Sequence, residues 1–243
     1  MRGTGPLAAT VALAAYGGLH WLGRTAGATR AERQGEMPGD DIVERPLIFL
    51  TTHATTIHAP PEAIWPWLVQ VGWHRGGWYT ARWVDRLLFP AKWPSSDEIV
   101  ESLQHLEVGD FVPDGPPESG AGFVVERLER DRHLVLHSRT HLPPGWGSRF
   151  GAWVDWTWAF ALDPLGPGRT RFRFRARGRV GPWWLAAGYW FVIVPADFVM
   201  SAQMMRGIKE RAERGGSVVD GTVPSSPTAH LQRPQEPEEA PWR

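Results

Sequence analysis

Three polar side chains of the sequence are of the types that general acid–base chemistry in an apolar pocket would use. Arg75 and Tyr79 lie in and just after a glycine-rich turn, HRGGWY, and His137 lies in a predicted strand. An arginine can hold a carboxylate or phosphate, and a tyrosine can donate a hydrogen bond. Arg75, Tyr79 and His137 are therefore the catalytic candidates. A solvated Arg75, with Trp78 and Tyr79 packing two helices together, would explain the same turn without any chemistry.

Metal, cysteine and serine chemistry are not indicated by the sequence. His133 and His137 share a strand face, but at about 3.3 Å per residue they lie roughly 13 Å apart, too far for one ion. His141 follows them without completing a ligand set, and the chain has no HExxH, no GxSxG and no cysteine. The turn HRGG also lacks the GK[ST] ending of a phosphate loop. We therefore expect neither a metal ion nor another cofactor.

The clearest pattern runs from Val154 to Arg179 and predicts two antiparallel strands joined by the turn DPLGPG. Side chains of a strand alternate between its faces, so one face of this hairpin is apolar and the other carries arginines. The apolar face needs a cover, and its aromatic side chains either fill a core or line a ligand cavity. These side chains are Trp156, Trp158, Phe160, Phe172 and Phe174.

The arginines between residues 171 and 179 occupy the opposite face of the second strand. We expect this face to be solvated, with Asp155 and Glu126 as partners of the arginines. In RNA-binding sheets the aromatic side chains face the ligand together with the basic ones, whereas here they are on opposite faces. The formal net charge is zero, so no nucleic-acid partner is expected.

The order of the predicted elements indicates an α+β fold. A strand at residues 50–58 precedes two short helices, one starting at the prolines of APPEAIWPWLVQVG and one within GGWYTARWVDRLLF. Further strands are predicted at 121–129 and 133–139. After a charge-free run at 180–196, the segment DFVMSAQMMRGIKERAER predicts a long helix with Met204 on its apolar stripe. Helices gathered on one face of an antiparallel sheet are typical of α+β proteins.

The resemblance of the chain to a known family rests on four segments: HAPPEAIWPWLVQVGWHRGGWYTARWVDR, LEVGDFVP, WTWAFAL…TRFRFRARGR and DFVMSAQMMRGIKERAE. They look like the START / polyketide-cyclase-like (SRPBCC) superfamily and cover about residues 50 to 214. The resemblance implies a helix-grip fold, in which a curved antiparallel sheet wraps round a long C-terminal helix. It also implies a cavity for an apolar ligand between sheet and helix. The candidate ligand-binding residues are then Arg75, Trp78, Tyr79, Trp156, Trp158, Phe160, Phe172, Phe174 and Met204.

The implied fold predicts binding or transfer of a hydrophobic small molecule or lipid. One alternative is an enzyme of the polyketide cyclase/dehydratase type, in which an acid/base group enolises a chain held in the pocket. Another is a non-catalytic, membrane-associated or partner-binding module. An acid/base pair inside the cavity would favour the enzyme, a wholly apolar cavity would favour carriage, and a filled core would favour the module.

The chain divides into four regions by composition. Residues 1–24 are apolar and predict a membrane anchor, a signal peptide or a soluble helix. Residues 25–49 read as a polar linker, residues 50–214 as the helix-grip domain, and residues 215–243 as a disordered tail rich in Pro, Ser and Glu.

Two apolar stretches, 4–23 and 180–196, are candidates for membrane contact. The chain contains 15 tryptophans, a residue enriched at membrane interfaces, and several of them lie in these two stretches. Arg24, Arg30 and Arg33 follow the first stretch. This excess of positive charge predicts a cytoplasmic main domain, membrane-associated or anchored at its N-terminus.

Overall fold

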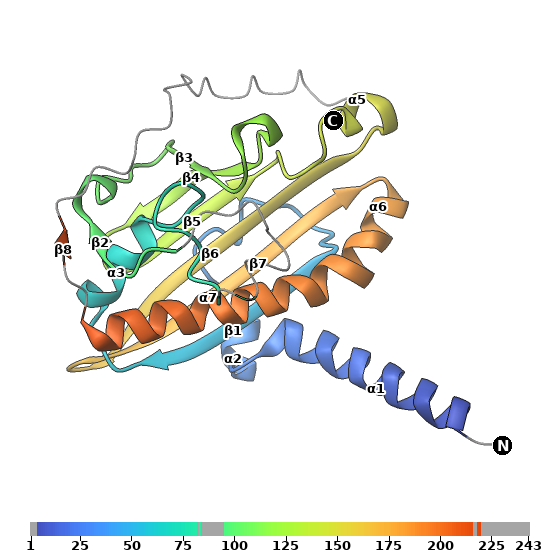
Figure 1. Cartoon of the computed structure of the whole chain (residues 1–243), viewed down its shortest axis with the longest axis horizontal. Helices are drawn as coiled ribbons and strands as arrows, with labels where there is room; N and C mark the ends of the chain where they lie inside the picture. Colours follow the sequence, from blue (N-terminus) through green and yellow to red (C-terminus); the bar gives the residue numbers. More distant parts are fainter. Residues whose placement is uncertain (1–3, 82, 84–94, 216–217, 220–243) are drawn as a thin grey trace.

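The computed structural model describes residues 4–81, 83, 95–215 and 218–219. It shows a curved, open, six-stranded antiparallel sheet with one long C-terminal helix lying across it (Figure 1). The predicted α+β, helix-grip arrangement is therefore confirmed. In chain order the elements are α1 Thr4–Thr25, α2 Arg30–Gln34, β1 Phe49–Ile57, α3 Pro61–Val69, β2 Ile99–Val100, η1 Glu101–Leu103, β3 Phe111–Pro113, η2 Pro117–Ser119, β4 Gly122–Glu129, β5 His133–Ser138, α5 Trp146–Phe150, β6 Trp153–Gly166, β7 Arg169–Gly181, α6 Trp183–Gly188, η3 Tyr189–Ile193, α7 Val194–Arg214 and β8 Val218–Val219.

The long hairpin predicted from the alternating aromatic residues is the β6–β7 pair at the middle of the sheet. The strand order is β1-β7-β6-β5-β4-β3. Phe160 lies opposite Phe174, and Trp158 lies opposite Ala176, so the aromatic side chains of both strands share the face that α7 covers. The strands predicted at 50–58, 121–129 and 133–139 are β1, β4 and β5, each within one residue of the expected ends.

The charge-free run at residues 180–196 begins at the end of β7 and continues as α6, the π-helix η3 and the start of α7; these three helical segments follow one another without a break. The sheet-facing stripe of α7 includes Met204 and Ile208, both fully buried. They pack in one core with the aromatic side chains of β6 and β7. Full burial of one such side chain contributes about 2–3 kcal/mol to folding.

Two predicted regions lie mostly outside the described residues. The first short helix is present as α3 and begins at Pro61 as predicted. The second was expected within GGWYTARWVDRLLF, where residues 82 and 84–94 are not described. Of the predicted disordered tail, only Gly215 and residues 218–219 are described; the latter form β8, which pairs with β2.

The outer face of the sheet is covered by the segment predicted to be a linker. Arg175 and Arg177 of β7 are buried, and both reach Asp40: Arg175 Nη1 is 2.5 Å from one carboxylate oxygen and Arg177 Nη1 is 3.1 Å from the other. Arg171 forms a second ion pair with Glu32, which follows the N-cap Thr29 of α2. The expectation of a solvated arginine face is therefore wrong for Arg175 and Arg177.

A buried histidine joins α1 to the main domain. The ring of His53, in β1, lies 2.7 Å from the Gly23 carbonyl through Nε2 and 3.1 Å from the Ser201 hydroxyl through Nδ1. A carbonyl can only accept, so Nε2 carries the proton and Nδ1 accepts from Ser201. Burial lowers the pKa of His53, which keeps the ring neutral. One side chain thus connects the end of α1, strand β1 and helix α7.

Replacing Asp40 by alanine should make the outer cover of the sheet unfold more easily. The change leaves Arg175 and Arg177 buried without their carboxylate, which typically costs about 3 kcal/mol. Asp41→Ala is the matched control, because Asp41 forms an exposed ion pair with Arg127 worth about 0–1 kcal/mol. Urea unfolding measures the free energy of unfolding of both variants. Equal losses of that free energy would contradict the structural role of Asp40.

The His53 network should make stability depend on pH below about 6.5. The folded state resists protonation of His53, whereas the unfolded chain accepts the proton near pH 6.5. Stability from this group is therefore complete above pH 6.5 and falls as the pH drops, by up to about 1.4 kcal/mol per unit. Urea unfolding at pH 7.5 and 5.5 should show this loss in the wild type. His53→Gln keeps an N–H for Gly23 but does not titrate, and it should show a smaller loss.

Candidate functional site

The candidate site centres on a carboxylate at a position where α7 otherwise carries core residues. Val194, Ser201, Met204 and Ile208 are buried and follow the spacing of one helical face. Asp197 falls on the same stripe, three residues after Val194 and four before Ser201, so it is directed at the sheet. The Asp197 side chain is half-buried, and within the described part of the chain no hydrogen bond or ion pair reaches it.

The environment of Asp197 changes its acidity. Burial raises the pKa of Asp197 to about 7, and repulsion from the nearby Asp114 carboxylate adds to the increase. A carboxyl group with this pKa is present in both protonation states near neutral pH. It can therefore donate a hydrogen bond, accept one, or transfer a proton.

Asp114 belongs to a short network of polar side chains next to Asp197. It lies directly after β3, and one of its oxygens is 3.0 Å from Nε2 of His141. Nδ1 of the same ring is 2.6 Å from the Ser138 hydroxyl and 3.3 Å from the indole nitrogen of Trp156. A carboxylate only accepts, so Nε2 carries the proton, and Nδ1 accepts from Ser138 and Trp156.

The loop after β5 holds this network in place. The Thr140 hydroxyl donates to the Gly122 carbonyl and accepts from the Gly122 N–H, which ties the loop to β4. The phenol of Tyr189 donates to the His141 carbonyl at 3.2 Å, which ties the loop to η3. Strands β3–β6 and the turn before α7 therefore converge on one side-chain cluster.

Aromatic rings surround the polar network. Phe123 and Trp156 lie 4.7 Å and 4.9 Å from the His141 ring, measured between centroids. Trp156 also contacts Tyr189 at 6.2 Å. Burial raises the pKa of Tyr189 to about 12, so its phenol stays protonated. A few polar groups within an apolar, aromatic wall are typical of small-molecule sites.

The structure places the predicted ligand-binding aromatics in two groups. Trp156 borders the polar network. Trp158 and Trp78 lie behind Trp156, with their ring centroids 5.2 Å apart. The indole nitrogens of both Trp78 and Trp158 are buried without a hydrogen-bond partner. The remaining side chains are fully buried in the packed centre between sheet and α7, away from the polar network: Phe160, Phe172, Phe174 and Met204.

Arg75 and Tyr79 lie at the other half of α7. The Arg75 guanidinium donates to the carbonyls of Val69 and Val71, and so holds the turn after α3. Tyr79 is buried where its carbonyl lies against Gly207, far along α7 from Asp197. Burial raises the pKa of Tyr79 further above its ordinary value, so it is a poor proton donor. The structure does not bring Arg75 and Tyr79 into the site.

His137 lies on the outer face of the sheet, opposite to the candidate site. Its two ring nitrogens lie 3.0 Å from Glu126 and 2.7 Å from Asp155. These are the two carboxylates that were expected to pair with the arginines of β7. The three catalytic candidates from the sequence, Arg75, Tyr79 and His137, therefore occupy different places and do not form one site.

The Ser138–His141–Asp114 network has the groups of a hydrolytic triad, but its serine is almost fully buried and also accepts from the Thr140 N–H. We therefore assign Ser138 the role of holding the His141 ring in place. Within the described residues, no three His, Cys, Asp or Glu side chains are grouped closely enough to hold a metal ion.

Sequence reasoning missed Asp197, Asp114 and the role of His141. Asp197 carried a detectable signal, because a carboxylate interrupts an otherwise apolar helical stripe. Asp114 and His141 carried none, since they lie on loops that only the strand pairing brings together.

Comparisons with known proteins show a likeness in structure only. No protein-family model matches the chain, and no curated protein matches it in sequence. The protein MLL2253 from Mesorhizobium loti is 16% identical with a TM-score of 0.40, over 68% of this chain and 98% of that chain. The Aha1 dimer from Colwellia psychrerythraea is 17% identical with a TM-score of 0.38, over 68% of this chain and 96% of that chain. The hypothetical protein jhp0584 from Helicobacter pylori is 10% identical with a TM-score of 0.43, over 73% of this chain and 99% of that chain. At TM-scores below 0.5, these likenesses carry no argument about ligand or activity.

Asp197→Asn should stabilise the protein at alkaline pH and have little effect at pH 4. The folded state favours the protonated form of Asp197, so ionisation costs stability as the pH rises from about 4 to about 7. A change of this size in pKa corresponds to about 4 kcal/mol of unfolding free energy. Urea unfolding at pH 4.5 and 8 measures the difference between variant and wild type. An equal effect at both pH values would contradict the raised pKa.

Proposed function

We propose that the protein binds a hydrophobic small molecule or lipid between the sheet and the first half of α7, and that it belongs to the START / polyketide-cyclase-like superfamily. The observation that carries the proposal is the unpaired, half-buried Asp197 carboxylate on the sheet-facing stripe of α7. A half-buried carboxylate without a protein partner is only partly hydrated, which costs free energy. A ligand that supplies the missing hydrogen bond would offset that cost.

The charges near Asp197 limit the chemistry of the ligand. Asp114 is close enough to raise the pKa of Asp197 by repulsion, and its own side-chain partner is the imidazole of His141. A carboxylate or phosphate on the ligand would be repelled by both acids. The site therefore fits an apolar molecule with a neutral or cationic polar group, such as a hydroxyl, a carbonyl or an amine.

A second candidate function is acid–base catalysis of the cyclase/dehydratase type. The pKa of about 7 favours it, because a general acid or base is most effective when its pKa is near the working pH. In this reaction Asp197, as carboxylate, removes a proton from the carbon next to a ligand carbonyl. The same group, once protonated, returns the proton.

Binding should depend on the polar group of the ligand. Native mass spectrometry and calorimetry with a long-chain alcohol and the alkane of equal length should show tighter binding of the alcohol. In Asp197→Leu the preference for the alcohol should fall about tenfold, since a net hydrogen bond is worth about 1–1.5 kcal/mol. Asp163→Leu, on the outer face of β6, is the matched control and should keep the preference. A wild type that binds both compounds equally, or neither, would overturn the binding proposal.

Catalysis is tested separately with a long-chain β-diketone in D2O. The protein should accelerate deuterium exchange at the carbon between the two carbonyls, with a rate that rises as the pH passes about 7, because the base is the ionised Asp197. Asp197→Asn should abolish the acceleration. Exchange no faster than in protein-free buffer, with binding intact, would exclude the enzyme and leave the carrier.

A further inference from the structure

We infer that the end of the molecule formed by α1, α5, α6 and η3 docks on a lipid bilayer, with α1 inserted into it. This inference goes beyond ligand binding and does not depend on it. It rests on two apolar surfaces from distant parts of the chain, on the contacts that join them, and on the charges at their edges.

The first surface is α1, which projects away from the sheet (Figure 1). It has 22 residues and reaches about 33 Å at roughly 1.5 Å per residue. Its C-terminal half is held: Tyr16 and His20 contact η3, and Gly23 bonds His53 and packs against Phe198. Further along the helix, Leu13 is 72% exposed and Trp21 is 61% exposed.

The apolar residues of α1 do not form a single stripe. At about 100° per residue, Val11, Leu13, Tyr16 and Trp21 point in directions spread round the whole helix. All four are exposed. A helix that docks on one protein partner needs one apolar face, whereas a helix that is apolar all round needs an apolar surrounding. The distribution therefore favours a bilayer over a protein groove.

The second surface is a cluster of large apolar side chains on α5, α6 and η3. Trp183 is 81% exposed, and Trp184 contacts both Trp146 and Phe150. Tryptophans of this kind are enriched where protein meets the polar–apolar boundary of a membrane. The exposed members of the cluster are Phe150, Trp183, Trp184, Phe191, Val192 and Ile193.

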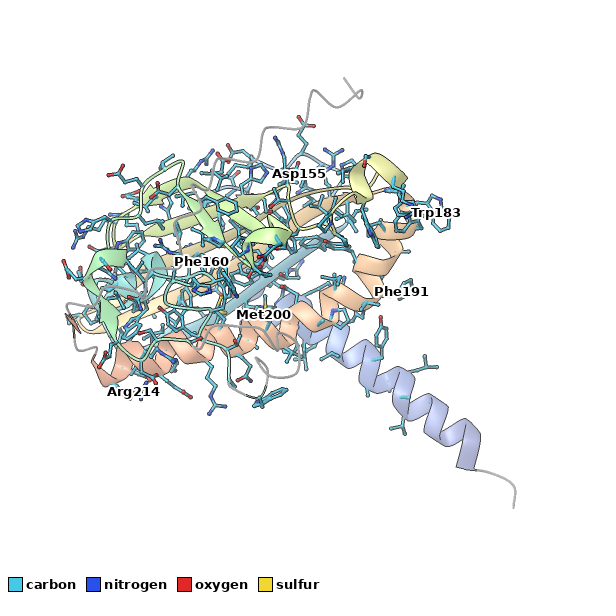
Figure 2. All side chains as sticks on the ribbon, turned by 45° about the horizontal axis from the view of Figure 1, so that its top comes forward. Asp155, Phe160, Trp183, Phe191, Met200 and Arg214 are labelled. Carbon is cyan, nitrogen blue, oxygen red and sulfur yellow. The ribbon has the colours of Figure 1, made fainter. Side chains whose placement is uncertain are left out.

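Direct contacts hold the two surfaces together. The Tyr16 phenol donates to the Phe191 carbonyl at 2.6 Å. The Trp190 ring lies 5.5 Å from the His20 ring and 5.4 Å from the Arg24 guanidinium carbon. Figure 2 shows Trp183 and Phe191 along the edge of the molecule from which α1 projects. The exposed apolar groups therefore form one end of the molecule.

Positive charge borders this end. Arg149 lies 5.1 Å from the Phe150 ring, and Arg24 closes the apolar run of α1. The sequence has no acidic residue before Glu32. Arginines beside exposed aromatic residues fit anionic lipid headgroups. Arg24, with Arg30 and Arg33, also places the domain on the cytoplasmic side of the bilayer.

By length and composition alone, one described helical run, Trp183–Arg214, could cross a membrane. Its α7 part packs on the sheet, where Met204 and Ile208 are fully buried. Only the α6 and η3 part is therefore assigned to the membrane surface.

The test is flotation of the full-length chain with vesicles of phosphatidylcholine and phosphatidylglycerol. The wild type should float with the vesicles. The double variant Trp183→Glu/Phe191→Glu and the single variant Leu13→Glu should lose most of the floating fraction, at least fivefold. The substituted side chains are exposed, so the fold should persist, which circular dichroism checks. Leu165→Glu, at the exposed end of β6, is the matched control and should float like the wild type.

Two results would overturn the inference. A wild type that stays at the bottom of the gradient, or Glu variants that float as well as the wild type, would show that this end does not bind lipid. A wild-type oligomer in detergent that the Trp183→Glu/Phe191→Glu change dissociates without reducing flotation would assign the surface to a second copy of the chain.

Discussion

The strict alternation of β6 and β7 is the constraint on which the rest of the structure depends. Because phenylalanine and arginine alternate along β7, burying one face forces a row of guanidinium groups onto the other. Helix α7 covers the aromatic face. The arginine face could not be closed by apolar residues alone, since Arg175 and Arg177 are buried and need a carboxylate. Asp40 supplies it, so the segment before β1 is as much a part of the fold as α7.

This two-sided cover also explains how α1 is attached. The chain that carries Asp40 across the outer face begins at the C-terminal end of α1. Gly27 lies directly against the backbone of Ala54 in β1, where a Cβ atom would not fit. His53, the neighbouring residue, turns to the inner face and meets both Gly23 and Ser201. The position of α1 beside η3 is therefore fixed by the same strand from both of its faces.

The sequence was sufficient for the parts of the fold that local patterns determine. The period-two alternation between Val154 and Arg179 predicted the hairpin, and prolines predicted the start of α3. The outer cover could not be predicted, because residues 25–49 have a polar composition and their ion pairs join residues more than 100 positions apart, such as Asp40 and Arg175.

The candidate site shows the same division between local and long-range information. Trp156 was predicted as a ligand-binding residue because the alternation of its strand placed it on the apolar face. Asp114 and His141 are 27 residues apart, and only the register of β3, β4 and β5 brings them to 3.0 Å. His137 was assigned to the interior because its chemistry suited a pocket, yet strand parity places it on the outer face, four residues from His133 and opposite Thr157.

The π-helix η3 has a consequence for how the two ends of the α6–α7 run are oriented. A π-turn accommodates one residue more than the α-helical path would need. Removing one residue between Tyr189 and Ile193 would therefore let the run continue as an α-helix, with Trp183 and Asp197 still on the faces they now occupy. Removing one residue from α6 instead would turn everything before it by about 100° relative to α7. Asp197 would then keep its place over the sheet, while Trp183 and Trp184 would swing away from α5. The π-turn therefore tolerates the loss of a residue that the α-helical turns beside it would not.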